Sequence, residues 1–207
     1  MKKRRFGIGL LFLFIALCTQ AQNKKINAIQ DIKNWQEELN KEYKNRATSP
    51  LKPEDFKVFV GHSFFDIDTA YRVTAKMVFT KDATEIPFKT TTAKVSMHTK
   101  YADLFFSIKG EKYKLSVYQS IDLMATAEYA DYLFLPFFDA TSGYETYGAG
   151  RYIDLRIPKK GNKIIIDFNK AYNPYCAYAP YFSCPKVPAE NELKTKIFAG
   201  VKYTPNH

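Results

Sequence analysis

The sequence predicts a mainly β fold, an antiparallel β-sandwich or open barrel with an N-terminal amphipathic helix. Three observations support this class. Apolar residues recur at helical spacing only from about residue 26 to residue 46. From residue 55 to residue 207, short runs rich in Val, Ile, Thr, Phe and Tyr alternate with polar residues at a period of two, as in half-buried strands. Prolines and glycines separate these runs, as expected of turns between antiparallel strands.

Residues 1–21, MKKRRFGIGLLFLFIALCTQA, have the composition of a secretory signal peptide. Four basic residues precede an apolar run, Phe6–Leu17, that is too short to cross a hydrocarbon layer of about 30 Å. We expect cleavage after the small residue Ala21, which makes the mature chain an exported protein, periplasmic or secreted. Lipid attachment at Cys18 is the alternative, and it is disfavoured because a bulky leucine precedes that cysteine.

The remaining residues, 22–207, are predicted to form a single domain, because their length suits one hydrophobic core. The net charge of +10 falls by the leader's four basic residues to +6. The other basic residues are spread along the chain, which is typical of a solvated surface and not of a nucleic-acid-binding stripe. We therefore predict no nucleic-acid partner, and no membrane span after signal cleavage.

The helix is predicted from INAIQDIKNWQEELNKEYKN, in which apolar residues lie three or four apart with charges between them. Such a face must pack against the rest of the domain. Pro50 and Pro53 then interrupt the pattern and lead into the β-rich part. The apolar face consists of Ile29, Ile32, Trp35, Leu39 and Tyr43.

About eight or nine strands are predicted in the β-rich part, and they include two hairpins. In ADLFFSIKGEKYKLSVYQ, two alternating runs are joined across Gly110 and Glu111, where glycine can supply the positive φ of a tight turn. In RYIDLRIPKKGNKIIIDFN, the turn is expected at Gly161 and Asn162. The other predicted strands lie in YRVTAKMVF, AKVSMHT, DYLFLPFF and KTKIFAGVKY.

The loop DATSGYETYGAGR concentrates polar residues between two apolar strands. Charges near a core are normally paired, because burying one alone is costly. One interpretation is therefore a buried ion pair of Arg151 with Asp139 or Glu145. The other is a pocket in which Arg151 holds an anionic or polar group while a carboxylate accepts hydrogen bonds or acts as general base. Both stay open at this point.

Histidine is scarce, and the sequence predicts no cofactor and no metal site. His98 falls on the polar side of an alternating strand and His207 is the last residue, so both are expected at the surface. A cysteine–histidine nucleophile could involve only His62, and VGHSFFD carries no recognisable catalytic pattern.

Several linked motifs, FLPFFDATSGYETYGAGRYIDL, IDFNKAYNPYCAY, FSCPKVPAENEL and IFAG, occur in this order. In these motifs the chain resembles domain of unknown function family 1684, a bacterial and archaeal family, of which this would be a secreted bacterial member. The resemblance extends from SPLKPEDF onward and implies no established reaction. At Tyr144 many relatives carry a lysine. The family's polar positions fall on Asp139, Thr141, Glu145, Tyr147, Arg151, Asp167, Asn169, Asn173, Cys176, Cys184, Glu190 and Asn191.

Cys176 and Cys184 are the only cysteines outside the leader, which predicts one disulfide that closes a short loop. Metal binding by the two thiols is the alternative. Around them, tyrosines recur at every third residue among prolines. These rings could form a shelf for a sugar, or they could cover the end of a sheet, which we favour. The tyrosines are Tyr172, Tyr175, Tyr178 and Tyr181.

The predicted site lies where the polar corner meets the C-terminal loop, and its expected function is non-catalytic binding of a small polar or glycan-like ligand. One alternative is a hydrolase that pairs Asp139 or Glu145 with Asp167 or Glu190 as carboxylates. Another is a structural or envelope-assembly protein. The candidate polar site comprises Asp139, Thr141, Glu145, Tyr147, Arg151, Asp167, Asn169, Asn173 and Glu190.

Overall fold

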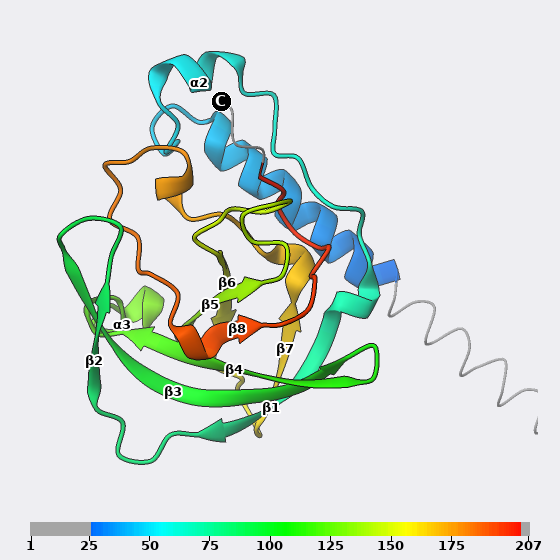
Figure 1. The fold of residues 1–207 in the computed structure, drawn as a ribbon, viewed down its shortest axis with the longest axis vertical. Helices are drawn as coiled ribbons and strands as arrows, with labels where there is room; N and C mark the ends of the chain where they lie inside the picture. The colour runs from blue at the N-terminus through cyan, green and yellow to red at the C-terminus, as the bar shows by residue number, and fades with distance from the viewer. Residues whose placement is uncertain (1–25, 204–207) are drawn as a thin grey trace, which may run out of the picture.

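The computed structural model describes residues 26–203, and it begins with the predicted amphipathic helix over residues 26–44 (Figure 1). Ile32 and Tyr43 on its apolar face are buried against the rest of the domain. The helix ends two residues earlier than predicted, followed by a turn in which Thr48 Oγ1 donates to the carbonyl of Glu42 at 2.9 Å. The predicted leader, with its alternative lipid site at Cys18, and His207 lie outside the described residues.

A second, short helix, α2 (Pro53–Val58), follows where the sequence indicated only an interruption. Pro53 occupies the first turn, where the missing N–H costs nothing. Glu54 and Asp55 lie in the same turn, where the positive end of the helix dipole stabilises their negative charges. Within residues 26–203, no helix is long and apolar enough to cross a membrane.

Eight strands form one curled sheet, a half-barrel, which confirms the mainly antiparallel class and selects the open-barrel alternative (Figure 1). The strand order is β6-β5-β4-β3-β1-β7; β2 is added beside β3, and β8 pairs with β5 in parallel. The strands are β1 (Arg72–Phe79), β2 (Glu85–Lys89), β3 (Val95–Ile108), β4 (Glu111–Ser120), β5 (Tyr132–Asp139), β6 (Arg151–Arg156), β7 (Lys163–Asp167) and β8 (Glu192–Leu193).

Strand β3 joins two runs that the sequence predicted as separate strands. A register shift between Lys100 and Ala102 bends it, so that its first part pairs with β2 and its second part with β1. Strand β2 was not predicted because it contains Pro87, which is tolerated here because β2 pairs on one side only. A short helix, α3 (Ile121–Met124), follows β4.

The two predicted hairpins have different outcomes. Strands β3 and β4 do form a hairpin, but its turn is Lys109–Gly110, one residue earlier than expected, with φ of 50° and 90°. The predicted β6–β7 hairpin is wrong, because β6 pairs with β5 and β7 with β1. These two strands are the opposite edges of the curled sheet, and residues 157–162 connect them across its open side.

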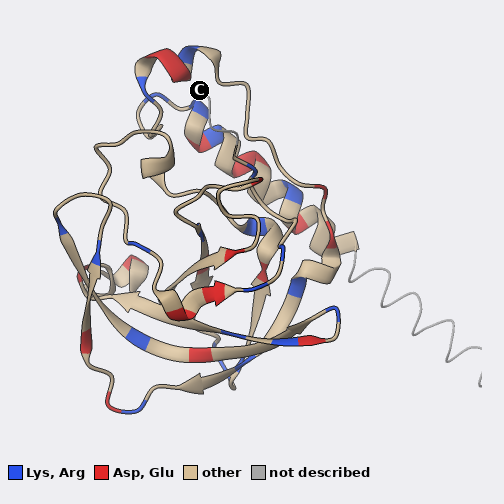
Figure 2. Cartoon of the chain, in the orientation of Figure 1, with Lys and Arg blue, Asp and Glu red and all other residues tan. Residues whose placement is uncertain are grey.

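The interior of the curl holds the main hydrophobic core, which includes the fully buried Leu104, Leu115, Leu135, Ile166 and Phe168. A smaller apolar cluster lies around Phe88, Tyr118 and Phe134. Basic and acidic residues are interspersed along the N-terminal helix and the strands of the sheet (Figure 2). This dispersion is the arrangement expected of a solvated surface.

Candidate functional site

The polar corner between β5 and β6 contains a fully buried ion pair. Arg151 Nη2 lies 3.0 Å from Asp139 Oδ1, and neither side chain is exposed to solvent. Arg151 also donates to the carbonyls of Ile197, at 3.0 Å, and Ala199. Burial lowers the pKa of Arg151, whereas the neighbouring carboxylate raises it. The geometry is that of the ion-pair interpretation of this loop.

The second oxygen of Asp139 is also occupied. Oδ2 accepts from the Thr141 hydroxyl at 2.7 Å, from the Thr141 N–H at 3.1 Å and from the Ile197 N–H at 2.9 Å. The Thr141 hydroxyl in turn contacts the Thr146 hydroxyl at 2.9 Å. The corner therefore anchors the β5–β6 loop to the C-terminal segment, and its carboxylate is not available to a ligand.

Asp167 and Asn169 form a separate network at the end of β7. Arg72 donates to Asp167 Oδ2 at 2.8 Å, and Asn169 Nδ2 donates to Asp167 Oδ1, also at 2.8 Å. Asn169 further accepts from the Asp68 N–H and donates to the Asp68 carbonyl, both at 3.0 Å. These contacts fix the segment that precedes β1.

The remaining predicted polar residues are dispersed. Glu145 pairs with Lys196 at 3.0 Å, and the Glu190 carboxylate accepts from the Tyr118 hydroxyl at 2.8 Å. The side-chain amide of Asn173, which is buried, donates to the Tyr178 hydroxyl at 3.2 Å. Asn191, also buried, spans β4 and β5 through Ser116 and Pro136. These residues thus belong to several separate ion pairs and hydrogen bonds, and they do not line one common pocket.

The prediction that His98 is exposed is wrong. Its ring is buried and stacks on Phe88, with ring centroids 4.4 Å apart. Desolvation lowers its pKa. The ring of Phe134 from β5 also lies near His98, with ring centroids 5.7 Å apart, so side chains of two other strands cover it. The alternation of polar and apolar residues along one strand cannot reveal that other parts of the chain cover its outward-facing residues.

The predicted disulfide is absent, because Cys176 and Cys184 are free thiols that lie beside each other. The Cys176 N–H donates to Cys184 Sγ at 3.2 Å. Thr91 holds Cys184 in place: the Cys184 N–H donates to the Thr91 hydroxyl at 3.0 Å, and the Thr91 N–H donates to the Cys184 carbonyl at 2.9 Å. No group of three metal-ligating side chains occurs among residues 26–203, so the metal alternative gains no support there.

We expect both cysteines of the mature protein to be free thiols, but only Cys176 to react in the native state. The hydrogen bond from Cys184 lowers the pKa of Cys176 to about 7, although burial opposes this. The pKa of Cys184 is raised by the same contact and by burial. Alkylation of Cys176 by iodoacetamide should therefore accelerate with a midpoint near pH 7, because the thiolate is the reactive form. Cys184 should react only after unfolding.

The measurement is the pH profile of thiol modification, followed by mass spectrometry of the modified peptides. The variant Cys176→Ser is the control and should lose the fast reaction. A native protein without any titratable thiol before reduction would show that the two cysteines are joined after all.

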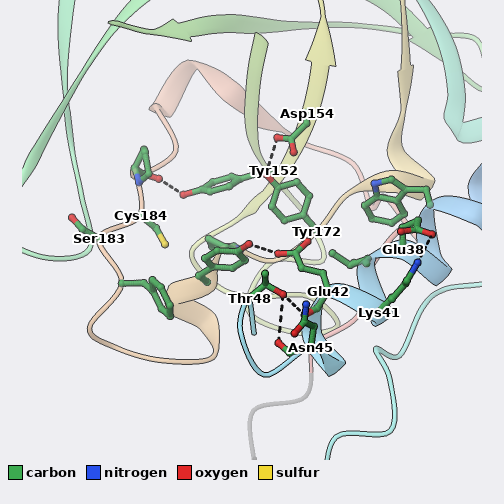
Figure 3. A pocket seen from close by; sticks show the side chains of 16 residues that line it. Glu38, Lys41, Glu42, Asn45, Thr48, Tyr152, Asp154, Tyr172, Ser183 and Cys184 are labelled. Atoms are coloured by element: carbon green, nitrogen blue, oxygen red, sulfur yellow. Dashed lines mark hydrogen bonds and ion pairs between the residues drawn. The ribbon is translucent and has the colours of Figure 1, made fainter. Parts of the chain in front are cut away.

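A cleft of about 720 Å³ lies between the N-terminal helix, the outer side of β6 and the C-terminal loop (Figure 3). The helix and its following turn form one wall, and the loop before Val187 forms the other. Tyr152 and Asp154 come from β6. The cleft is lined by Trp35, Glu38, Leu39, Lys41, Glu42, Asn45, Thr48, Tyr152, Asp154, Tyr172, Pro174, Tyr175, Phe182, Ser183, Cys184 and Pro185.

Asp154 is the most unusual group in this cleft. Its Oδ1 accepts from the hydroxyls of Tyr132 and Tyr172, both at 2.7 Å. Asp154 is an exposed residue that lines the cleft (Figure 3). Desolvation by the surrounding protein raises the pKa of Asp154, and the two tyrosine hydroxyls and Arg156 oppose the rise. A carboxylate with these features is typical of a functional site.

Other hydroxyls fix the walls of the cleft. The Tyr175 hydroxyl donates to Glu42 Oε1, which ties the loop to the helix, and the Tyr152 hydroxyl donates to the carbonyl of Pro185. The ring of Tyr175 contacts that of Phe182 edge to face, with centroids 5.2 Å apart. Tyr172 and Tyr175 thus belong to the cleft, so part of the tyrosine series lines a cavity, whereas Tyr181 is exposed outside it.

The predicted site and the cleft overlap only in the C-terminal loop. Sequence reasoning missed Asp154, Glu42 and Trp35 as site residues. One signal was available for Asp154, the acidic residue of β6, which stands between Tyr152 and Arg156 on the outward side of the strand. The helical residues gave no such signal, because a polar helix face is normally a solvated one.

The fold and the cleft define a class of small β protein in which a curled antiparallel sheet carries a cleft at its edge. The model of a family described as protein of unknown function (DUF1684) matches residues 57–202, and the chain belongs to this family. This confirms the resemblance noted in the sequence.

The fold is similar to the solution NMR structure of an uncharacterized protein from Haloarcula marismortui. The two sequences are 31% identical, and the TM-score is 0.71. The alignment covers 89% of this chain and 99% of that one. A comparison with curated proteins found no match.

Proposed function

We propose that this protein binds a small polar, glycan-like ligand in the cleft between the N-terminal helix and the C-terminal loop. The observation that carries the proposal is the lining of the cleft, in which aromatic rings alternate with carboxylates and amide or hydroxyl groups. Its volume of about 720 Å³ falls within the range usual for small-molecule sites, roughly 300–1,000 Å³.

This lining suits the two kinds of surface that a sugar presents. The C–H face of a pyranose ring packs on aromatic rings, which here come from Trp35, Tyr172 and Phe182. The ring hydroxyls are hydrogen-bond donors and need acceptors such as the carboxylates of Glu42 and Asp154. The cleft therefore offers both recognition modes within one cavity, on walls that hydrogen bonds hold in place.

Binding without catalysis is proposed because the carboxylates considered for hydrolysis have structural partners. Asp139 and Asp167 are buried in ion pairs, Glu145 pairs with Lys196, and Glu190 accepts a hydrogen bond from Tyr118. None of the four is among the residues that line the cleft. If the predicted leader directs export, the ligand would be a periplasmic or extracellular compound.

We expect Phe182→Ala to weaken ligand binding about 5-fold to 100-fold, because stacking of a ligand on an aromatic side chain contributes roughly 1–3 kcal/mol. The adjacent Tyr181→Ala is the matched control: Tyr181 belongs to the same loop but is 66% exposed and does not line the cleft. Both variants should fold.

The measurement is a thermal-shift screen of the mature protein against oligosaccharides, followed by titration of each hit with the two variants. A specific ligand raises the melting temperature by mass action. The proposal fails if no compound in the screen shifts the melting temperature, or if Phe182→Ala and Tyr181→Ala bind a hit equally well.

A further inference from the structure

The cleft carries more negative than positive charge. Its charged lining residues are Glu38, Lys41, Glu42 and Asp154. Lys41 Nζ lies 3.5 Å from Glu38 Oε1, and these side chains are 77% and 72% exposed at the rim. Glu42 and Asp154 form no ion pair with a basic side chain within residues 26–203. Two carboxylates on opposite walls therefore lack a cationic partner.

Neutral donors occupy only one oxygen of each of these carboxylates. Glu42 Oε1 accepts from Tyr175, and Asp154 Oδ1 accepts from Tyr132 and Tyr172. The second oxygens, Glu42 Oε2 and Asp154 Oδ2, accept no hydrogen bond from residues 26–203. Glu42 is partly exposed, Asp154 is exposed and both line the cleft, so these oxygens can accept from a donor that enters it.

The nearest basic group is already engaged. Arg156 lies two positions beyond Asp154 on β6, but its Nη1 donates to Asp131 Oδ1 and to the carbonyl of Glu128, both at 2.7 Å. The charge of Arg156 lowers the pKa of Asp154 from a distance, without a hydrogen bond between the two side chains. A cation supplied by a ligand would thus find an unoccupied position beside Asp154.

We propose that the ligand of this cleft is a hydroxylated amine of the amino-sugar class that carries more than one ammonium group, for pairing with Asp154 and with Glu42. This inference rests on the proposed binding function and specifies its ligand. An ammonium group has three donors for the free carboxylate oxygens. It is also attracted to the faces of aromatic rings such as Trp35 and Tyr172, which a carboxylate ligand would not be.

The test compares β-1,4-linked trisaccharides of glucosamine, glucose and N-acetylglucosamine, which differ only at the second carbon of each ring. Binding is measured by calorimetry with the mature protein at low and at physiological salt. We expect the glucosamine trisaccharide to bind roughly tenfold tighter than either neutral one, since a hydrogen bond to a charged group contributes about 1.5–3 kcal/mol. Added salt should reduce this preference.

Variants show whether the cleft carboxylates cause the preference. Asp154→Asn and Glu42→Gln should each reduce it severalfold. Glu111→Gln makes the same change in net charge at the exposed β3–β4 turn and should leave it intact. Two variants are used so that the test survives misfolding of either one.

The outcomes separate this inference from the proposed function. If all three trisaccharides bind equally, the cleft is a glycan site without an amine preference, and the inference is overturned while the proposed function stands. If none binds, both fall. A preference for glucosamine that persists in both carboxylate variants would also overturn the assignment, because the charge would then act from elsewhere on the molecule.

Discussion

Replacing Arg151 with alanine is expected to lower the free energy of unfolding by about 3–5 kcal/mol, the usual cost of removing one partner of a buried ion pair. Asp139 would stay in the core without its counter-ion, and the carbonyls of Ile197 and Ala199 would each lose a donor. The loss is large because both charged side chains are completely buried. Urea unfolding of the purified variant measures it.

Lys160→Ala is the matched control, since it also removes one basic side chain but lies exposed in the turn before β7. Its stability should stay within about 0.5 kcal/mol of the parent, as is usual for surface changes. Equal urea midpoints for the two variants would contradict the ion pair.

Replacing Gly200 with alanine is expected to destabilise the protein by about 2–5 kcal/mol, through backbone strain and overpacking together. Gly200 has a φ of +81°, a conformation that side chains disfavour. A Cβ here would lie 2.5 Å from the Ala171 carbonyl oxygen and 2.9 Å from the Phe168 carbonyl oxygen. These are backbone atoms, so they cannot move aside as a flexible side chain would.

Gly110→Ala provides the comparison, because Gly110 also has a positive φ, +90°, yet no atom lies within 4 Å of the position that a Cβ would occupy there. It should cost about 1–2 kcal/mol, from strain alone. Thermal and urea unfolding of the two variants would separate strain from the steric clash. A Gly200→Ala variant as stable as Gly110→Ala would argue against close packing of the C-terminal segment on the β7 end.

The features that were predicted correctly depend on local sequence. The helix follows from the spacing of residues such as Ile32 and Tyr43, and the β3–β4 hairpin follows from two alternating runs around Gly110. The β6–β7 pairing was predicted by the same local rule and failed. Which strands join is decided across the whole sheet, where β7 pairs with β1, and adjacency in sequence alone does not determine that choice.

The candidate site likewise has features that depend on local sequence and features that depend on the whole fold. An ion pair of Arg151 with Asp139 or Glu145 was one of two interpretations of the loop, because charges beside apolar strands need partners, and the structure pairs Arg151 with Asp139. The cleft could not be predicted, because Trp35, Asp154 and Phe182 come from three distant parts of the chain and no spacing links them. The buried stacking of His98 on Phe88 was missed for a related reason: the side chains that cover it come from two other strands.

Because the N-terminal helix supplies one whole wall of the cleft, the cavity exists only while the helix stays docked. The family match begins at residue 57, after that helix, so the matched part of the chain contains only the opposite wall. Transient detachment of the helix, a local opening well below global unfolding, would abolish the cavity while leaving the curled sheet intact. Occupancy of the cleft and protection of the helical amides from hydrogen exchange are then two measures of a single equilibrium.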